Sequence, residues 1–293
     1  MAKLTIVTPT FNRADLLHKC YESLLAQTNG NFEWIVVDDG STDNTQKTVS
    51  SFGTDFPIKY IKKENGGKHT ALNASYPYID GDYVLILDSD DYLVENAVEL
   101  VLDGWKNYVD DPTIGIVVFL KGSDEDKPFC KARDEDEYKP VDVMRYERVS
   151  ISSHDCCEVI RSKVFKMYPF PVFENEKFLS EGALWNRVSF THKCVYINKV
   201  ICVAEYLEGG LTQSGRKLRI NNPLGGMYTA NLNMNRKNYF YRRIKNGLLY
   251  TAYGFFAKKN LIEQLKETDS KLIVLLCYPV GALLYLDWKN KYC

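Results

Sequence analysis

The sequence predicts an α/β fold: a Rossmann-like, mostly parallel sheet with flanking helices, followed by a helical C-terminal appendage. Three observations support this prediction. Short apolar segments alternate with amphipathic segments over the first 120 residues, two of the apolar segments end directly in clustered acids, and the composition becomes basic and apolar beyond residue 208. Strands separated by helices imply right-handed crossovers, which place the strands parallel in one sheet.

The alternation defines the elements of the first half in turn. The segment 14–27 is amphipathic, because Leu17, Tyr21 and Leu24 recur at helical spacing on one face. Residues 34–37 read Trp-Ile-Val-Val, a run typical of a strand that is buried on both faces. By the same criteria we expect strands at 4–8, 34–37, 58–61, 83–87 and 114–120, and helices at 14–27, 43–52, 68–74 and 95–108.

The region after residue 120 has a weaker pattern. Residues 124–137 contain seven acids, and a solvated loop is favoured over a second metal site. From there to about residue 207 the sequence predicts short irregular elements.

The most informative segment is 83–91, where an apolar strand ends in Asp-Ser-Asp-Asp. Such a strand places acids at the carboxyl edge of the sheet, where α/β proteins bind ligands. Carboxylates crowded there repel one another unless a cation lies among them. Mg²⁺ and Mn²⁺ prefer oxygen ligands, and Mg²⁺ commonly bridges protein carboxylates and substrate phosphates. The segment therefore predicts a metal-assisted enzyme that acts on a phosphorylated donor.

The composition argues against several other classes. The net charge of −1 gives no support for nucleic-acid binding, and the N-terminus lacks the pattern of a signal peptide. The eight cysteines include no C-x-x-C pair, which favours reduced cytosolic thiols, and no His spacing supports a zinc site. The sequence also lacks the G-x-G-x-x-G and Walker signatures, which argues against a dinucleotide oxidoreductase or a P-loop enzyme.

Four motifs together resemble a known family. They are Thr-Pro-Thr-Phe-Asn-Arg at 8–13, Asp-Asp-Gly-Ser-Thr-Asp at 38–43, Asn-Gly-Gly-Lys at 65–68 and Asp-Ser-Asp-Asp at 88–91. Each is weak alone, but in this order they resemble the inverting glycosyltransferases of family 2, which have the GT-A fold. The resemblance is strong to about residue 120. It implies transfer of a sugar from a nucleotide diphosphate sugar to an acceptor, with inversion at the anomeric carbon.

The resemblance assigns the nucleotide to the ends of the first two strands. Thr8 and Pro9 leave the first strand where a nucleotide could lie across the sheet edge. Asp38 and Asp39 are expected to contact base and ribose, and Asp39 is suited to accept a hydrogen bond from the imide N–H of uracil. A turn-forming or helix-capping role is the alternative for Asp38. The expected donor is therefore a UDP-sugar.

The other two motifs are expected to bind the diphosphate and a metal ion. Lys68 opens a helix after two glycines and could reach donor phosphate or ribose; a solvated lysine is the alternative. By resemblance, Asp90 is the main ligand of Mg²⁺ or Mn²⁺, while Asp88, with Ser89 beside it, contacts ribose or metal-bound water. Asp91 either binds metal or caps the following helix. The metal would stabilise the departing nucleoside diphosphate.

Acceptor activation requires a general base, and Glu181 is the leading candidate. Related enzymes often carry a Glu-Asp pair downstream with the Asp as base, but Gly182 stands at the Asp position here. In the alternative, Glu181 orients a neighbouring group and His154 or Asp155 is the base. Trp185 is expected to wall the acceptor sugar, with ordinary core packing as its alternative.

The C-terminal part carries two further features. Residues 211–216 resemble the flexible loop that closes over the donor, with Arg216 as a bidentate clamp for the diphosphate. Residues 209–262 contain ten Lys or Arg and no Asp or Glu, and 272–286 is nearly all apolar but short for a spanning helix. These neighbouring segments favour a monotopic contact with an anionic membrane, and a core-packing helix pair is the alternative.

The predicted organisation is a glycosyltransferase domain at 1–208, divided into a nucleotide-sugar half (1–120) and an acceptor half (121–208), and a membrane-associating helical region at 209–293. The expected protein is a hexosyl- or N-acetylhexosaminyl-transferase at the inner face of the cell membrane. Its acceptor would be lipid-linked or a polysaccharide, in cell-surface glycan synthesis. Because Gly182 replaces Asp, a catalytically silent nucleotide-sugar or glycan-binding protein is the alternative. A nucleotidyltransferase is disfavoured, because residues 9–12 do not form a glycine-rich, basic phosphate-binding segment.

Overall fold

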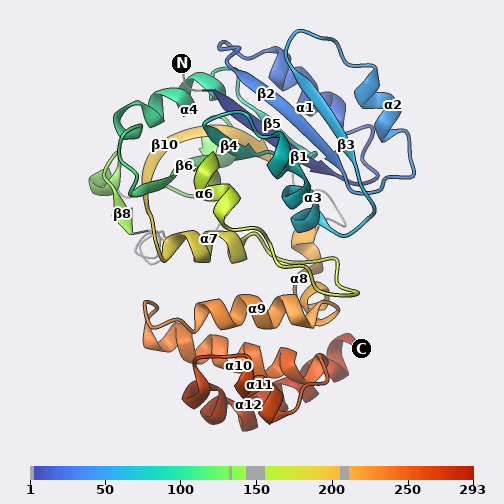
Figure 1. The fold of residues 1–293 in the computed structure, drawn as a ribbon, viewed down its shortest axis with the longest axis vertical. Coiled ribbons are helices and arrows are strands. Elements are labelled where there is room, and N and C mark those ends of the chain that lie inside the picture. The colour runs from blue at the N-terminus through green and yellow to red at the C-terminus, as the bar shows by residue number, and fades with distance from the viewer. Residues whose placement is uncertain (1–2, 132–133, 143–155, 205–210) are drawn as a thin grey trace. The chain divides into compact units, whose positions relative to one another are not determined.

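The computed structural model describes residues 3–131, 134–142, 156–204 and 211–293 (Figure 1). The chain divides into two compact units. Unit 1 comprises Met1–Pro169 and Thr191–Tyr206, and unit 2 comprises Phe170–Phe190 and Leu207–Cys293. The segment Phe170–Phe190 thus belongs with the C-terminal helices, and the domain boundary after residue 208 stays a prediction.

Unit 1 is built on a ten-stranded mixed sheet with helices packed against it (Figure 1). The strand order is β3-β2-β1-β4-β9-β6-β10-β5, with β7 paired to β6 and β8 paired to β10. β1 to β4 run parallel, whereas β9 is antiparallel to both β4 and β6, and β5 is antiparallel to β10. The strands are β1 Leu4–Thr10, β2 Phe32–Asp38, β3 Ile58–Lys62, β4 Tyr83–Ile86, β5 Asp91–Leu93, β6 Ile114–Asp124, β7 Lys127–Pro128, β8 Val141–Asp142, β9 Cys156–Arg161 and β10 Lys193–Ala204. The predicted α/β class is confirmed.

The first four helices of unit 1 follow the predicted order, and α6 is an addition to it. They are α1 Leu17–Leu25, α2 Thr45–Ser50, α3 Lys68–Ser75, α4 Ala97–Trp105 and α6 Ser162–Met167, with 3-10 turns at Tyr76–Tyr78, Lys106–Tyr108 and Asp134–Asp136. α4 buries Val98, Val101 and Trp105 on one face. Trp105 stacks on Tyr83 of β4, with ring centroids 4.3 Å apart, so this helix is held on the sheet by an aromatic pair.

The core of unit 1 explains the long apolar strand segments. Ile6, Trp34, Val36 and Leu85 are fully or almost fully buried in one cluster with the inner faces of the helices. Burying a side chain of this size stabilises the fold by roughly 1.5–3 kcal/mol. β1 and β2 are buried along their whole length, which explains why their sequences are mostly apolar.

Unit 2 consists of helices. They are α7 Gly182–Ser189, α8 Leu211–Ile220, α9 Pro223–Asn233, α10 Phe240–Phe256, α11 Leu261–Lys266 and α12 Lys271–Tyr292. α10 and α12 approach closely where each carries a glycine. A Cβ on Gly247 would lie 2.5 Å from Ile273, and one on Gly281 would lie 1.8 Å from the hydroxyl oxygen of Thr251. The absence of these two side chains therefore permits the helix contact.

α12 is longer than the apolar segment from which it was predicted. It has 22 residues and contains Pro279. By length and composition it could cross a membrane, and only 28% of its most apolar window is buried inside the protein. A single helix of this kind is weak evidence for a membrane span. Its outer face exposes Leu272, Leu276 and Leu283, while Ile273 and Cys277 are buried.

Candidate active site

The carboxyl ends of three parallel strands lie side by side in unit 1. Thr10 of β1 pairs with Asp38 of β2, and Val7 of β1 pairs with Ile86 of β4. This register brings the two acidic motifs to one edge of the sheet. An edge of this kind is where open α/β sheets bind ligands.

Two acids of the Asp-Ser-Asp-Asp motif are partly exposed and paired with basic side chains. Asp88 forms an ion pair with Lys68 at the start of α3. Oδ2 of Asp90 lies 2.7 Å from Nη1 of Arg13, which follows β1. The side chains of Asp88 and Asp90 are 35% and 21% exposed, so a ligand could reach both carboxylates.

The pKa of Asp88 is lowered. Burial at the strand end raises it, but the charges of Lys68, Lys121 and Arg13 outweigh that effect. Asp88 is therefore ionised at neutral pH and can act as an oxygen donor.

Asp91 has a different environment from the other two acids. It is 5% exposed, and its Oδ2 lies 2.8 Å from Nζ of Lys121 in β6. The pKa of Asp91 is raised to about 6, mainly because the carboxylate is buried. The charge of Asp88 raises this pKa further, whereas the charge of Lys121 lowers it. It also begins β5, which pairs with β10. Asp91 thus supports the fold behind the site.

Asp88 and Asp90 are the residues that fit a divalent cation. Mg²⁺ is usually held by one or two carboxylates, with water and substrate phosphates at its other positions. Among the residues that the structure describes, no group of three or more His, Cys, Asp or Glu could hold a metal. The two carboxylates therefore fit a metal shared with a phosphorylated ligand better than a closed structural site. When a metal binds, Lys68 and Arg13 would either keep their ion pairs with these carboxylates or give them up to the metal.

Asp39 joins the second and third motifs. Its Oδ1 lies 2.7 Å from Nζ of Lys63 and accepts the N–H of Gly66 at 3.0 Å, and its Oδ2 accepts the N–H of Gly67 at 2.6 Å and the side-chain amide of Asn65 at 3.1 Å. The carboxylate therefore shapes the glycine turn that precedes α3. A hydrogen bond to a uracil N–H would add to, or compete with, these four.

Glycine is required in two neighbouring turns, the one that precedes α3 and the one that follows β2. Gly67, the residue before α3, has φ +93°, and Gly40 has φ +84°. L-residues with side chains rarely adopt such angles. A Cβ on Gly40 would also lie 2.7 Å from the backbone nitrogen of Asn65. The turn before α3 fixes the direction in which Lys68 leaves toward Asp88.

Other residues expected to contact the nucleotide are buried. The hydroxyl of Thr8 accepts a hydrogen bond from the indole of Trp34 at 2.8 Å, and Pro9 and Ser89 are also inaccessible. Asp38 is fully buried and accepts the N–H of Ser41 at 2.7 Å and the hydroxyl of Tyr60. These bonds match the turn-forming alternative for Asp38, and the nucleotide contacts of all four residues stay predictions.

Glu181 and Trp185 lie in unit 2, on α7. Glu181 is the N-cap of this helix, and its carbonyl accepts the N–H groups of Leu184 at 2.8 Å and Trp185 at 3.2 Å. Glu181 and Trp185 are both half-buried. A Cβ on Gly182 would approach only the Ser180 hydroxyl, at 3.4 Å, so the helix has room for a side chain to begin at this position. His154 and Asp155 lie outside the described residues.

Arg216 lies in a helix rather than in the expected loop. Residues 211–220 form α8, which is broken at Gly215 with φ +43°. The guanidinium carbon of Arg216 lies 4.0 Å from the ring centroid of Trp288 in α12, a cation–π geometry. This contact holds Arg216 within unit 2, and its role as a diphosphate clamp stays a prediction.

Sequence reasoning missed three basic residues of the site. Arg13 closes the first motif, Lys63 follows β3, and Lys121 lies in β6 just beyond the predicted strand 114–120. Arg13 and Lys63 follow parallel strands, and Lys121 lies in the second half of β6, which runs parallel to β10. Their position near the strand ends was the sequence signal that could have identified them, because a basic side chain at this edge of the sheet can pair with the acids there.

The family profile described as "Glycosyl transferase family 2" matches residues 5–167. Glycosyltransferase GlyA of Streptococcus pneumoniae is 29% identical over 225 residues, which cover 72% of this chain and 32% of GlyA. Chondroitin synthase of Pasteurella multocida is 37% identical over 115 residues, 39% of this chain and 12% of that protein. The chain thus spans about a third or less of the length of these relatives.

Solved structures with a similar fold support the GT-A prediction. The Staphylococcus aureus protein TarS (residues 1–349, in complex with UDP-GlcNAc) has a TM-score of 0.63 and 17% identity, covering 95% of this chain and 79% of that one. The mannosyltransferase PcManGT of Pyrobaculum calidifontis, in complex with GDP-Man and Mn²⁺, has a TM-score of 0.59 and 17% identity, covering 99% and 83%. At this identity the likeness shows the fold.

Proposed function

The chain belongs to glycosyl transferase family 2, and on that premise we propose that it transfers a sugar from a nucleotide diphosphate sugar to an acceptor hydroxyl, with inversion at the anomeric carbon. The observation that carries the proposal is the pair of partly exposed carboxylates, Asp88 and Asp90, at the carboxyl edge of the sheet. They lie beside Lys68 and Arg13, which can bind phosphate once the acids bind a cation.

We propose UDP as the nucleotide and Mg²⁺ or Mn²⁺ as the ion. Solved proteins with this fold bind UDP-GlcNAc, or GDP-Man with Mn²⁺, so the fold accommodates both kinds of ligand. A hexose or an N-acetylhexosamine is the proposed sugar. The acceptor proposal, a polysaccharide or lipid-linked glycan, draws on the relatives named chondroitin synthase and hyaluronan synthase.

The reaction assigns one role to each residue. Asp88 and Asp90 would hold the ion, which when bound neutralises charge on the departing diphosphate. Lys68 and Arg13 orient the phosphate oxygens. The oxygen of the acceptor hydroxyl bonds to the anomeric carbon from the face opposite the diphosphate. Glu181 accepts the proton that this hydroxyl loses. The bond from that carbon to the phosphate oxygen breaks, and UDP leaves with the electron pair.

Trp185 and Arg216 take supporting roles in this proposal. The half-buried ring of Trp185 would lie against the acceptor sugar, four residues beyond Glu181 and on the same helix. Arg216 would release Trp288 to reach the diphosphate, a change that requires α8 to reorganise at Gly215.

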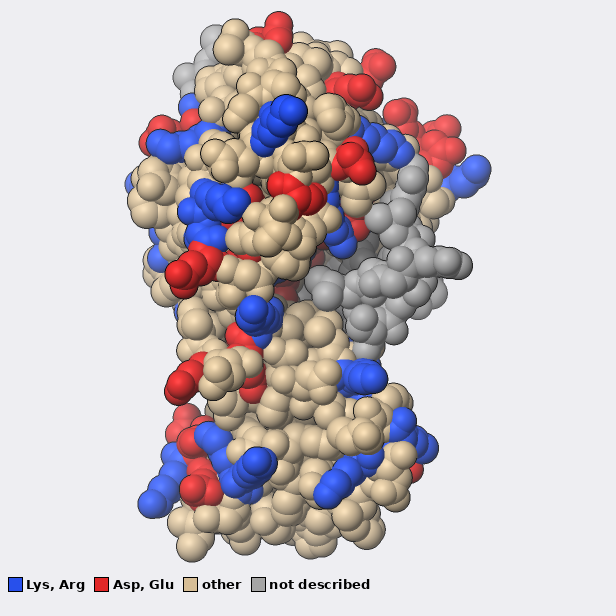
Figure 2. Space-filling view, turned by 90° about the vertical axis from the view of Figure 1, so that its right-hand side faces the viewer, with Lys and Arg blue, Asp and Glu red and all other residues tan. Residues whose placement is uncertain are grey.

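We also propose that α12 lies in the surface of a membrane at the cytosolic side. Leu272, Leu276, Val280 and Leu283 form one exposed apolar stripe at helical spacing. Figure 2 shows a largely uncharged surface at the lower end of the view, with Lys and Arg and also Asp and Glu side chains above it. Exposed basic residues next to an apolar stripe favour anionic lipids. Loss of vesicle binding on changing Leu276 and Leu283 to Ser tests this contact.

A silent nucleotide-sugar or glycan-binding protein is the second candidate. Gly182 at the position of the usual aspartate favours it. Release of UDP from a UDP-sugar separates the two, because a binding protein releases none. We expect purified protein to hydrolyse at least one UDP-sugar slowly with Mn²⁺ and not with EDTA, as measured by UDP formation. Absence of UDP formation from a panel of UDP-sugars, with binding retained, would favour the second candidate.

A further inference from the structure

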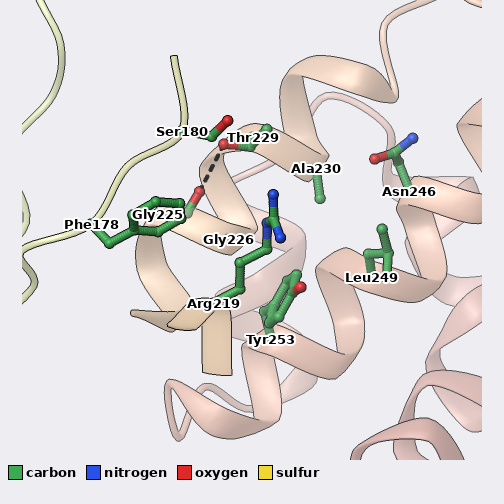
Figure 3. Close-up of a pocket in the computed structure, with 10 residues that line it drawn as sticks. All are labelled: Phe178, Ser180, Arg219, Gly225, Gly226, Thr229, Ala230, Asn246, Leu249 and Tyr253. Carbon is green, nitrogen blue, oxygen red and sulfur yellow. Dashed lines mark hydrogen bonds between the residues drawn. The ribbon is translucent and has the colours of Figure 1, made fainter. Parts of the chain in front are cut away.

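Unit 2 contains a cavity that none of the roles above uses (Figure 3). Its volume is about 70 Å³, room for a few water molecules or for one tetrahedral anionic group. The lining comes from α8, α9, α10 and the segment before α7: Phe178, Ser180, Arg219, Gly225, Gly226, Thr229, Ala230, Asn246, Leu249 and Tyr253.

The cavity depends on the small residues of α9. A Cβ on Gly226 would lie 2.9 Å from the ring of Tyr253, and one on Gly225 would lie 2.8 Å from the carbonyl of Phe178. The two glycines therefore let α10 and the segment before α7 approach α9. The ring of Tyr253 is almost wholly buried in this contact, and it forms a rigid wall of the cavity.

The lining can donate several hydrogen bonds and carries one positive charge. Figure 3 shows the guanidinium of Arg219 extending into the space between Ser180, Thr229 and the hydroxyl end of Tyr253. Arg219 also donates to the carbonyl of Gly215 at 3.3 Å, one bond of the five that a guanidinium can make.

The acidic side chain that borders the cavity already accepts hydrogen bonds from the backbone. None of the ten described lining residues is acidic. The carboxylate of Glu176 borders Gly225, but its oxygens accept the N–H groups of Leu224 and Gly225 at 2.6 and 2.8 Å. Residues 209–262 contain no acid at all. Arg219 is itself an exposed residue, so an anion from outside the chain can reach its guanidinium.

We infer that this cavity binds an anionic group, a phosphate or a carboxylate, and that the group belongs to the acceptor. The assignment of this group to the acceptor rests on the proposed function. Ser180 lines the cavity and directly precedes Glu181, the proposed base and the N-cap of α7, so an acceptor anchored here would lie beside the start of the helix that carries that base. The acceptor class would then be an anionic glycan or a glycan carried on phosphate.

Binding of inorganic phosphate to the full chain in EDTA tests the site without the metal and donor. We expect saturable thermal stabilisation by phosphate that chloride at equal ionic strength does not give. Arg219→Gln should weaken phosphate binding roughly tenfold or more, because it removes a charge-assisted hydrogen bond. Arg219→Lys should keep part of the affinity. Lys217→Gln removes a charge two residues away on the same helix that does not line the cavity, and it should leave the affinity unchanged.

The outcomes separate this site from the donor site. Equal loss of affinity in Arg219→Gln and Lys217→Gln, or no saturable binding, would overturn the inference. Binding of UDP with Mn²⁺ should be intact in Arg219→Gln, so failure of the cavity and failure of the proposed function give different results. Repeating the titration with glycerol phosphate and with glucuronate identifies which anionic group the cavity prefers.

Discussion

The two units of this protein distribute charge differently along the chain. In unit 1, acids and bases at one sheet edge are paired, as in Asp88 with Lys68 and Asp90 with Arg13. In unit 2, the stretch 209–262 has ten bases and no acid; Lys259 pairs with Glu267 beyond the stretch, and Arg219 lines a cavity. The first arrangement suits a cation and a diphosphate together, since the acids can bind the cation and the bases can bind the diphosphate. The second suits an anion alone.

The largest expected effect is at the metal-binding edge of unit 1. Asp90→Asn keeps the size of the side chain but removes the charge that would hold the ion, so we expect turnover to fall by about three orders of magnitude. Rates of UDP release with Mn²⁺ measure this. Asp124→Asn, at the exposed end of β6, is the control and should retain its rate. Similar losses of turnover in both variants would contradict a specific role of Asp90 in binding the metal.

The proposed base in unit 2 gives the next effect. Glu181→Gln should lower turnover about a hundredfold or more, with nucleotide binding unchanged, because general-base catalysis is lost. Near-normal turnover in this variant would eliminate Glu181 as the base.

A second change at the same helix sharpens that test. Gly182→Asp should be tolerated, because a Cβ there meets only the Ser180 hydroxyl at 3.4 Å. In the Glu181→Gln background we expect Gly182→Asp to restore part of the turnover. Unchanged inactivity of the double variant, with normal folding by circular dichroism, would argue that position 182 does not face the acceptor.

Packing inside unit 2 predicts a change in stability. Gly281→Ala forces a methyl group toward Thr251, 1.8 Å from its hydroxyl, and should lower the free energy of unfolding by about 1–3 kcal/mol. Gly30→Ala has nothing within 4 Å of its new methyl group and serves as the matched control. Urea denaturation measures both. Equal stability of the two variants would show that α10 and α12 separate without cost.

The smallest effect concerns a buried carboxylate of unit 1 away from the site. Burial raises the pKa of Glu33, but hydrogen bonds from Lys3, Thr5 and the backbone of Asp80 outweigh it and lower the pKa. Since the folded-state pKa lies below the unfolded one, this stabilisation is present above about pH 4.5 and is lost as pH falls through the folded-state value.

Glu33→Gln should therefore be less stable than the natural protein at pH 7, by about 1 kcal/mol. The difference should shrink toward pH 3.5 in urea denaturation. Glu174→Gln, at an exposed residue, should show no such convergence. A gap that widens in acid would mean that the pKa of Glu33 is raised.

The sequence predicted unit 1 far better than unit 2. Strand segments such as 34–37 and 83–87 are apolar runs that end in acids, and local pattern suffices to place both the strand and the edge it reaches. β9 was missed because its pairing between β4 and β6 is set by residues far apart in the chain.

The partners of the predicted site residues also depend on the fold. Asp39 was expected to face a nucleotide, but its four hydrogen-bond donors come from residues 63–67, more than twenty positions away. Arg216 was expected in a loop, but it lies in α8 and its guanidinium lies over the ring of Trp288. No local pattern specifies such contacts.

Calorimetric titration of the full chain with UDP, in Mn²⁺ and in EDTA, tests most directly whether the charges at the sheet edge of unit 1 bind a metal and a diphosphate together. We expect UDP to bind at least roughly tenfold more tightly with Mn²⁺, because ion and diphosphate share Asp88 and Asp90. We also expect Asp90→Asn to abolish that gain. UDP affinity that is the same in Mn²⁺ and EDTA, or unchanged by Asp90→Asn, would contradict the assignment.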